Sequence, residues 1–583
     1  MLHTLTRSLR ENKGPALVTV LLSALEVVFE IVIPLFMSNL IDFGIEGGSM
    51  AAVWKFGAFL LLLAAFQLAT GVLAARIAAR ASVGFAANLR EDMYDNVQTF
   101  AFSNIDKFST ASIVTRLTTD TTNVQNAFQM LMRMAIRAPV MLIFSMIVSF
   151  RISRDISMTF LIILPILALA LFFIIRSVFP VFTRVFRTYD ELNNVVQENV
   201  RGIRVVKSFN QEQHEIGKFG AISARIYKDF SKGERLITLN APLMQFCIYT
   251  CMIVISWLGA KAIIASGNDP ALGLTTGNLT ALITYTMQIL SSLMMLSMVF
   301  AMLTISLSSA RRIAEVLEER SDIPQPEQPV MTVRDGAVDF DHVSFVYASK
   351  ADKKVLDDID LHIRSGETIG IIGGTGASKS SLVQLIPRLY DVTGGKLTLG
   401  GVDVRDYDLD TLRGAVAMVL QKNELFSGTI KENLRWGNEN ATDEELQHAC
   451  VLACADEFIS AMPDGYDTHI EQGGTNVSGG QKQRLCIARA LLKKPKVLIL
   501  DDSTSAVDTR TDAQIQQALS TYIPDTTKII IAQRISSVQN ADRIVVLDDG
   551  HIDAVGSHDE LLRTCEIYRE VYESQQKGGE DNA

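Results

Sequence analysis

Residues 368–381 read TIGIIGGTGASKSS, and the order of residue types in this stretch decides the fold around it. Residues 368–372 form an apolar run of strand length, residues 373–376 hold three glycines, and Lys379 opens a stretch that suits a helix. A strand, a glycine-rich loop and a helix in this order form the unit that cradles phosphate on backbone N–H groups. We therefore predict a phosphate-binding α/β domain in the C-terminal half.

The loop departs at one position from the phosphate-loop pattern G-x-x-x-x-G-K-[ST], because Ser378 stands where the pattern has Gly. Serine still supplies a backbone N–H, Lys379 can reach the β- and γ-phosphates, and Ser380 can ligate Mg²⁺. If residue 378 requires a positive φ, serine costs about 1 kcal/mol relative to glycine. The predicted phosphate-binding residues are Gly373, Gly374, Thr375, Gly376, Ala377, Ser378, Lys379, Ser380 and Ser381.

A second apolar strand, KVLILD at residues 496–501, ends in the carboxylate of Asp501. In phosphate-loop ATPases a buried strand delivers such a carboxylate to the Mg²⁺ side of the nucleotide. Apolar strands that end in Asp are common, so this strand indicates a nucleotide site only in combination with the glycine-rich loop. We expect Asp501 to lie behind the ligands of Mg²⁺.

Between the loop and this strand lies VSGGQKQR, residues 477–484. Here the chain resembles the ATP-binding cassette (ABC) superfamily, whose signature is usually LSGGQ. The resemblance covers essentially the whole chain, since ENVRGIRVVK at residues 198–207 looks like the stretch before the second cytoplasmic coupling loop of exporter-type members. It implies a half-transporter, with six membrane spans fused to one cassette that binds ATP and Mg²⁺.

The resemblance also implies roles for single positions. Tyr347 would stack on adenine, although a core tyrosine at a strand end is the alternative. Gln421 would sense the γ-phosphate and join Ser380 as a ligand of Mg²⁺, and Asp508 would lie in the loop that crosses the dimer interface. The γ-phosphate of ATP on the opposite cassette would be bound by the signature residues Ser478, Gly479, Gly480 and Gln481.

Two positions depart from the family at the catalytic centre, which Asp502, Gln533 and Gln421 would form. Asp502 stands where hydrolytic members have the Glu that polarises the attacking water, and Gln533 stands at the switch histidine. Aspartate is shorter by roughly 1.5 Å, and misplacing a general base by about 1 Å can cost about 100-fold in rate. Glutamine cannot carry a proton, but its amide can still donate to a phosphate.

These departures are clustered. Ser378, Asp502 and Gln533 belong to the site on this chain's own loop, and Gln472 is a fourth position where many homodimeric exporters have Glu. The signature, which serves the other site, is nearly intact. The chain thus resembles one subunit of the asymmetric heterodimeric bacterial multidrug-type exporters, in which one ATP site is degenerate. A homodimeric exporter with two slow sites and a regulatory subunit that transports nothing are the alternatives.

The N-terminal half has a different composition. The chain of 583 residues is 48% hydrophobic and only 20% charged, which excludes a disordered protein, and its six cysteines do not suggest a disulfide scaffold. Several apolar stretches approach or exceed the ~20 residues that cross a bilayer as a helix. Six spans are predicted, near residues 15–41, 52–75, 137–152, 156–180, 240–265 and 278–303. The third and fourth would form a hairpin that turns at residues 151–155.

We therefore expect a six-span α-helical transmembrane domain whose helices run on into the cytosol, fused to an α/β phosphate-loop domain. The resemblance adds an antiparallel β subdomain and a helical subdomain to the latter. The expected boundaries are residues 1–318 for the membrane domain, 319–336 for a linker, 337–575 for the nucleotide-binding domain and 576–583 for a polar tail.

Charge separates the two halves. Residues 1–318 hold 27 Lys and Arg against 21 Asp and Glu, whereas residues 319–583 hold 27 against 43. The acidic half argues against nucleic acid as a partner. The segments 43–51 and 266–277 contain no Lys or Arg and are expected outside, which places both termini and the nucleotide-binding domain in the cytoplasm. We expect a bacterial plasma-membrane protein whose partners are a second half-transporter, lipid and a small amphipathic substrate.

Two carboxylates lie at membrane depth, Glu26 and Glu30, on one face of the first span. Intramembrane carboxylates are costly and face a cavity or a partner. Either they bind a cationic substrate or protons, or they pair with an arginine of the same bundle. The sixth span is rich in methionine, which forms adaptable apolar surface or packs as an ordinary helix face.

Overall fold

The computed structural model describes residues 1–269, 273–347, 354–374 and 376–580. The chain forms two compact units. One comprises Met1–Gln98 and Thr110–Glu319, and the other comprises Thr99–Ser109 and the chain from Arg320 on. The short segment Thr99–Ser109 thus groups with the second unit, although the sequence placed it inside the membrane domain.

The first unit is helical. Its helices are α1 (Leu2–Arg7), η1 (Arg10–Asn12), α2 (Lys13–Asn39), η2 (Leu40–Glu46), α3 (Met50–Gln98), α5 (Thr110–Thr115), η3 (Arg116–Asp120), α6 (Thr121–Ile152), α7 (Arg154–Arg201), α8 (Ile203–Ser208), α9 (Glu212–Thr238), α10 (Asn240–Ser266) and α11 (Thr276–Glu318). Six helical stretches among the described residues are long and apolar enough to cross a membrane. They run over Arg10–Glu46, Met50–Gln98, Thr110–Ile152, Arg154–Arg201, Glu212–Ser266 and Thr276–Glu318. The six predicted spans are therefore confirmed.

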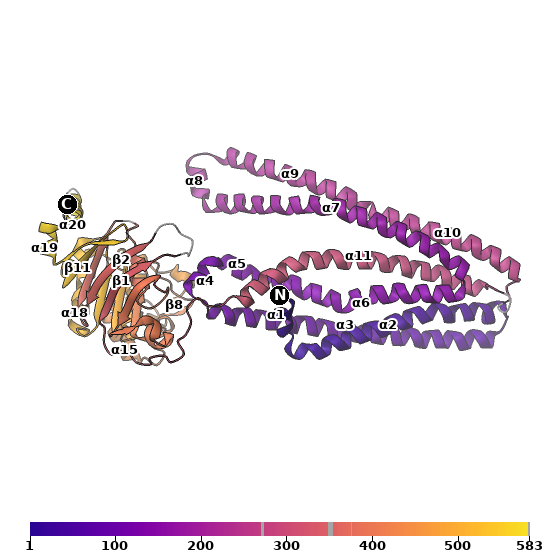
Figure 1. The fold of residues 1–583 in the computed structure, drawn as a ribbon, viewed down its shortest axis with the longest axis horizontal. Helices are drawn as coiled ribbons and strands as arrows, with labels where there is room; N and C mark the ends of the chain where they lie inside the picture. The colour runs from indigo at the N-terminus through magenta and orange to yellow at the C-terminus, as the bar shows by residue number, and fades with distance from the viewer. Residues whose placement is uncertain (270–272, 348–353, 375, 581–583) are drawn as a thin grey trace. The chain divides into compact units, whose positions relative to one another are not determined.

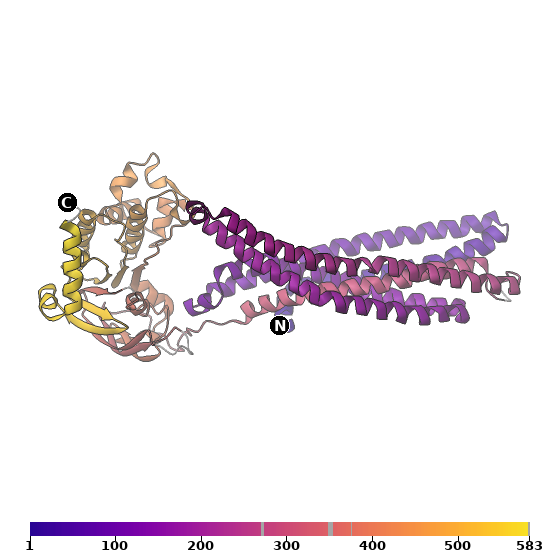
Figure 2. The same cartoon turned by 90° about the horizontal axis from the view of Figure 1, so that it is seen from above.

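The helices of this unit pack in two groups. Helices α2, α3, α6 and α11 contact one another, and α7 runs alongside α9 and α10 (Figure 1). Figure 2 shows the same pairing of α7 with α9 and α10 from above. The predicted hairpin between the third and fourth spans is confirmed, because Ser153 adopts an extended conformation between α6 and α7.

Several helices of this unit are longer than a bilayer is thick. Helix α3 has 49 residues, which at 1.5 Å per residue gives about 74 Å, against about 30 Å for the hydrocarbon core. Helix α7 has 48 residues. No proline interrupts α3, so nothing in its backbone prevents the helix from continuing past the membrane. The expected helix extensions are confirmed.

Asp42, a charged residue at the end of the first span, binds the N-terminal end of helix α11. Its Oδ1 accepts the N–H of Gly277 at 2.8 Å, and its Oδ2 accepts the hydroxyl of Thr275 at 2.6 Å. A carboxylate that accepts the first N–H groups of a helix satisfies donors that have no partner inside the helix and complements its dipole. Asp42 therefore joins the end of the first span to the start of α11.

The second unit contains twelve strands among its described residues: β1 (Val338–Phe345), β2 (Leu356–Ile363), β3 (Thr368–Gly373), β4 (Gly394–Leu399), β5 (Val402–Asp403), β6 (Val416–Val419), β7 (Gly428–Thr429), β8 (His469–Ile470), β9 (Val497–Asp501), β10 (Thr527–Ile531), β11 (Arg543–Asp548) and β12 (His551–Gly556). Its helices are α4 (Phe102–Lys107), α12 (Lys379–Gln384), η4 (Val404–Asp406), α13 (Leu409–Ala415), α14 (Ile430–Arg435), α15 (Asp443–Leu452), α16 (Asp456–Ser460), η5 (Gly465–Asp467), η6 (Gln472–Gly474), α17 (Gly479–Leu492), α18 (Thr509–Tyr522), η7 (Ile535–Ser537), α19 (His558–Thr564) and α20 (Glu566–Glu580).

The strands form a six-stranded sheet in the order β12-β11-β3-β10-β9-β6 and a four-stranded sheet in the order β2-β1-β4-β5. In the six-stranded sheet only the pairing of β12 with β11 is antiparallel. The four-stranded sheet is antiparallel throughout. With the short helices α14, α15 and α16 between β7 and β8, the α/β fold with an antiparallel β subdomain and a helical subdomain is confirmed.

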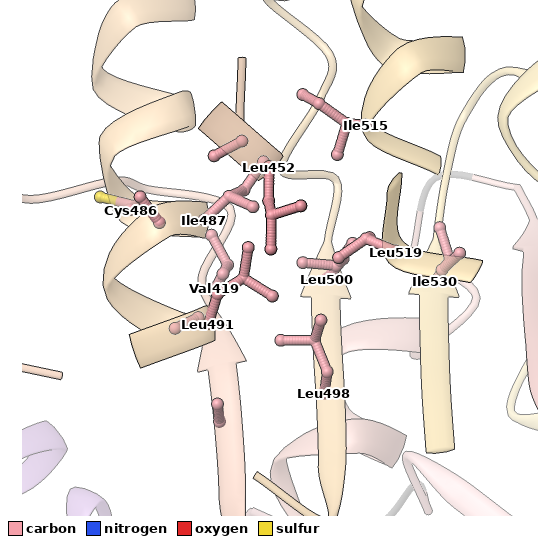
Figure 3. Close-up of a cluster of buried hydrophobic side chains, with 14 of the residues drawn as sticks. Val419, Leu452, Cys486, Ile487, Leu491, Leu498, Leu500, Ile515, Leu519 and Ile530 are labelled. Carbon is pink, nitrogen blue, oxygen red and sulfur yellow. The ribbon is translucent and has the colours of Figure 1, made fainter. Parts of the chain in front are cut away.

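Alternate residues of the six-stranded sheet face two different cores. Leu498 and Leu500 of β9 pack with Ile487 and Leu491 of α17 and with residues of α15 and α18 (Figure 3). Val497 and Ile499 of the same strand belong to the core shared with the antiparallel sheet. Because successive side chains of a strand point to opposite faces, a continuous apolar run is what a strand covered on both faces requires.

The segment Thr99–Ser109 is held within the second unit by polar and aromatic contacts. The Nδ2 of Asn104 donates to the carbonyl of Arg320 at 3.0 Å, and the hydroxyl of Tyr390 donates to Asp106 Oδ2 at 2.8 Å. The ring of Phe102 meets that of Tyr390 edge-on at 6.0 Å. At the other end of the unit, α20 continues to Glu580, so residues 576–580 of the expected tail are helical.

Asp42→Ala is expected to lower the thermal stability of the detergent-solubilised chain, with a loss of about 2 kcal/mol, because the carboxylate that accepts the Gly277 N–H and the Thr275 hydroxyl disappears. The measurement is the melting temperature at a fixed detergent and lipid content. Asp190→Ala is the matched control, since Asp190 is an exposed carboxylate of α7. Equal melting temperatures of the two variants would contradict the capping role.

Candidate nucleotide-binding site

The predicted site residues lie at the carboxyl ends of four adjacent parallel strands. Strand β10 pairs with β3 on one side and β9 on the other, and β9 pairs with β6. The register aligns Ile531 with both Ile371 and Asp501. The loops that follow these strands therefore emerge at one edge of the sheet, where they bring together the phosphate loop, Asp502, Gln533 and Gln421.

Backbone conformation in the phosphate loop explains its glycines and exposes one exception. A Cβ at Gly373 would lie 2.2 Å from the carbonyl oxygen of Leu547, so no side chain fits there. Gly376 has φ +88°, and Ser378 has φ +66°. Residue 378 therefore does require a positive φ, and serine at this position is strained by about 1 kcal/mol relative to glycine. The predicted residue Thr375 lies outside the described residues.

The two side chains that follow the loop make contacts suited to an anion and a cation. The Nζ of Lys379 donates to the carbonyls of Gly373 and Gly374, both at 2.8 Å, which folds the lysine back over the loop. The hydroxyl of Ser380 donates to Asp501 Oδ1 at 3.0 Å. Asp501 thus stands behind the predicted Mg²⁺ ligand Ser380.

Asp502 is bound by the two glutamines that the sequence singled out. The Nε2 of Gln533 donates to Asp502 Oδ2 at 2.8 Å, and the Nε2 of Gln421 donates to the same oxygen at 3.5 Å. Asp502 itself has φ +48°, and its N–H donates to the carbonyl of Ile531 at 3.0 Å. The three predicted catalytic positions therefore meet at one carboxylate oxygen.

Burial shifts the charged groups of this edge toward their neutral forms. It lowers the pKa of Lys379 and raises the pKa values of Asp501 and Asp502, in each case chiefly because the charged form is desolvated. A nucleotide phosphate would give Lys379 a counter-charge, and Mg²⁺ would do the same for the carboxylates. The donor set thus fits both groups: an ammonium and loop N–H groups for phosphate, and a hydroxyl backed by a carboxylate for Mg²⁺.

The signature residues begin α17. The hydroxyl of Ser478 accepts the N–H of Gln481 at 3.3 Å, and Gln481 Oε1 accepts the N–H of Ser478 at 2.9 Å, which is a capping box. A Cβ at Gly480 would lie 2.8 Å from the carbonyl of Ala506, and a Cβ at Gly479 would lie 3.5 Å from the Ala506 side chain. The two glycines therefore let this helix start lie against the loop that leads to Asp508.

Family models match both parts of the chain. The model described as "ABC transporter transmembrane region" matches residues 16–294, and the model described as "ABC transporter" matches residues 356–505. The ABC transporter ATP-binding protein YfiB of Bacillus subtilis is 36% identical over 558 residues, which cover 96% of each chain. Rv1273c of Mycobacterium tuberculosis, of the same description, is 33% identical over 99% of this chain and 98% of its own. The chain belongs to the ABC transporter family.

A solved structure shares the fold. The structure of a bacterial Atm1-family ABC exporter with ATP bound matches with a TM-score of 0.82 over 97% of this chain and 99% of its own, at 24% sequence identity. With six membrane-crossing helices, this ABC transporter is a multi-pass membrane protein.

Tyr347 of this ABC transporter lies just after β1 and is half-exposed. Its hydroxyl shares a hydrogen bond of 2.8 Å with Ser381 Oγ, next to the phosphate loop. Its ring meets those of Phe345 and Tyr390 edge-on, with centroids 4.8 and 5.1 Å away. With 45% of its surface exposed, Tyr347 is not a core residue.

The sequence did not indicate Gln575, which holds the loop of Gln533. From α20, Gln575 Nε2 donates to the carbonyl of Gln533 at 2.8 Å, and its Oε1 accepts the N–H of Ile535 at 2.9 Å. A lone glutamine in a polar C-terminal helix carries no motif, so no sequence signal could have found it. In the structure, Gln575 joins α20 to the loop of Gln533.

Ser378→Gly is expected to raise the melting temperature of the nucleotide-free chain, because glycine adopts φ +66° without the ~1 kcal/mol penalty of an L-residue. Ser378→Ala is the matched control, since it removes the hydroxyl but keeps the Cβ and the strain. We expect no stabilisation in Ser378→Ala. A gain of equal size in both variants would show that the hydroxyl, and not the backbone, is responsible.

Proposed function

We propose that this ABC transporter is one subunit of an ATP-driven exporter that moves hydrophobic or amphipathic compounds out of a bacterial cell. Six spans fused to one ATP-binding cassette, the two bacterial relatives and the fold shared with a protein titled as an exporter support the proposal. The membrane would be the plasma membrane, with both termini and the nucleotide-binding domain in the cytoplasm. The segments 43–51 and 266–277, which lack Lys and Arg, would face outward.

In this proposal the functional parts keep the boundaries drawn from the sequence: residues 1–318 cross the membrane, 319–336 link, 337–575 bind nucleotide and 576–583 form the tail. Lys379 and the loop N–H groups hold the phosphates, Ser380 and Gln421 ligate Mg²⁺, and Tyr347 stacks on adenine. The signature residues Ser478 to Gln481 bind the nucleotide of the partner cassette, toward which Asp508 also points.

The transport step follows from two cassettes that close head to tail around two ATP molecules. Closure moves the long helix extensions and turns the membrane cavity from inside to outside, and hydrolysis releases the closed state. ATP can shift the equilibrium between the open and closed states only by the difference between its affinities for the two states. The connection between Gln483 and Ala506, whose N–H donates to Gln483 Oε1 at 3.0 Å, ties the signature helix to the loop of Asp508 during this movement.

One observation carries the further proposal that this chain's own ATP site hydrolyses poorly. The carboxylate at the position of the catalytic base, Asp502, is already held by the amides of Gln533 and Gln421 on one oxygen. It is also shorter than a glutamate by roughly 1.5 Å, and its neighbour at the switch position cannot carry a proton. We infer a heterodimer in which the partner's phosphate loop, together with this chain's signature, forms the working site.

In the assembled complex, Asp502→Ala is expected to reduce ATP turnover less than threefold, whereas Ser478→Ala reduces it at least tenfold. Asp502 serves a site with little hydrolysis to lose. The Ser478 hydroxyl stabilises charge on the γ-phosphoryl group in the partner's site, an effect that can be worth a few kcal/mol. The measurement is steady-state phosphate release at matched assembly.

Ser557→Ala is the control for the helix cap, because Ser557 forms the same capping box with Glu560 at the start of α19. It should leave turnover unchanged, although it loses a cap as Ser478→Ala does. If Asp502→Ala abolishes turnover and Ser478→Ala does not reduce it, this chain's own site is the working one and the asymmetric assignment is wrong.

Purified without a partner, the chain is expected to bind ATP and to hydrolyse it at less than a tenth of the rate of the complex. The complex with a second half-transporter should have one copy of each chain. Phosphate release and the mass of the detergent-solubilised species, measured on the same sample, check both statements. Substrate-stimulated turnover by the pure homodimer at the rate of the complex would contradict the heterodimer.

A further inference from the structure

A cavity of about 180 Å³ lies among α2, α6 and α11 in the membrane-crossing part of the first unit. Its wall includes Glu30, Arg137, Met287, Gln288, Ser291 and Met295. An ion cluster and a thioether surface thus line the same space. Charged side chains at membrane depth are costly and mark binding sites or ion pathways.

The ion cluster contains one more negative group than positive. Arg137 Nη1 binds Glu26 Oε1 at 2.7 Å, and its Nη2 binds Glu30 Oε2 at 2.7 Å. The sequence left open whether these carboxylates pair with an arginine or bind a substrate, and the pairing is confirmed. Pairing does not neutralise the cluster, however, because a single guanidinium faces two carboxylates and leaves a formal charge of −1.

The two carboxylates occupy different positions relative to the cavity. Glu26 is buried, with its Oε1 close to Gly71 of α3, where a Cβ would approach it to 3.2 Å, and it does not line the cavity. Glu30 does line the cavity. Among the described residues, only Arg137 binds the Glu30 carboxylate, through Oε2, which leaves Oε1 to face another cation.

The rest of the wall adds no competing charge. Gln288 is held by its neighbours, since its Nε2 donates to the backbone carbonyl of Glu30 at 3.2 Å and its Oε1 accepts the hydroxyl of Ser145 at 3.2 Å. Met287 and Met295 supply flexible, polarisable surface that adapts to ligands of different shape. The cavity therefore offers one surplus negative charge beside an adaptable apolar wall.

We propose that this cavity binds the headgroup of a monovalent organic cation, with Glu30 as its counter-charge. The inference rests on the proposed function as an exporter of amphipathic compounds, and it narrows the substrate class. The size fits a headgroup and not a whole drug: a cavity of about 150 Å³ accepts benzene, whereas drug-sized ligands occupy about 300–1,000 Å³. An anion is disfavoured because the two carboxylates outnumber the one guanidinium and leave the cluster with a formal charge of −1.

The test compares Glu30→Gln with Glu26→Gln. Both substitutions remove one arm of the Arg137 cluster and one unit of negative charge, but only Glu30 lines the cavity. The probes are benzyltrimethylammonium and its neutral isostere neopentylbenzene, bound to the full chain in lipid nanodiscs without nucleotide and measured by equilibrium dialysis. We expect Glu30→Gln to weaken binding of the cation at least tenfold. Glu26→Gln should weaken it by a clearly smaller factor, because it also removes the surplus charge but leaves the carboxylate of the cavity wall in place. Neither substitution should change binding of the neutral probe more than twofold.

A cluster that only holds α2 against α6 predicts the same change in cation binding for both substitutions, and that result would overturn the proposal. Equal binding of the two probes by the wild-type chain would also overturn the proposal.

If Glu30→Gln does not fold, Ser291→Lys provides the test, because it places a tethered ammonium in the cavity wall and keeps both carboxylates. It should abolish cation binding, whereas the uncharged, unbranched Ser291→Met should retain the preference for the cation. Cation binding by Ser291→Lys at the wild-type level would count against the site. These binding measurements contain no nucleotide, so their outcome does not depend on ATP-driven export. Failure of the proposed export function would appear separately, as absent ATP turnover.

Discussion

The parallel pairing of β3, β10, β9 and β6 is the constraint on which the nucleotide site depends. In parallel strands the carboxyl ends meet at one edge, so residues far apart in the chain, from Gly373 to Gln533, become neighbours there. The pairing is possible because these strands are apolar on both faces and are covered by α17 on one side and by the antiparallel sheet on the other. A charge placed inside β9 would disturb the core that its side chain faces and thereby move Asp501 and Asp502.

At this edge, chemistry and stability oppose each other. Burial disfavours the charged forms of Lys379, Asp501 and Asp502, and Ser378 keeps a strained backbone. A bound phosphate with its cation would relieve the first of these costs, because it supplies counter-charges to the lysine and the carboxylates. In the membrane unit, Arg137 pairs with both Glu26 and Glu30 inside an apolar bundle. One guanidinium faces two carboxylates, and the carboxylate that lines the cavity is that of Glu30.

Much of the fold follows from the sequence because it depends on local pattern. The six spans are long apolar runs, the turn at Ser153 lies between charged residues, and the strands β3 and β9 begin and end within a residue or two of the predicted runs. What the sequence did not indicate depends on contacts between distant residues. The grouping of Thr99–Ser109 with the second unit rests on pairs such as Tyr390 with Asp106, and the hold of Gln575 on the loop of Gln533 rests on one side chain.

The sequence by itself determined which chemistry is present: a phosphate loop with Lys379 and Ser380, a signature at 477–484, and the substitutions Ser378, Asp502 and Gln533. Residue identity and spacing carry that information because the motifs bind through backbone groups and single side chains. Only the tertiary structure decided that both Gln421 and Gln533 bind one oxygen of Asp502, and that Arg137 joins Glu26 and Glu30 with only Glu30 at the cavity. Those contacts depend on strand register and helix rotation, which are set by packing over the whole domain and leave no local pattern in the chain.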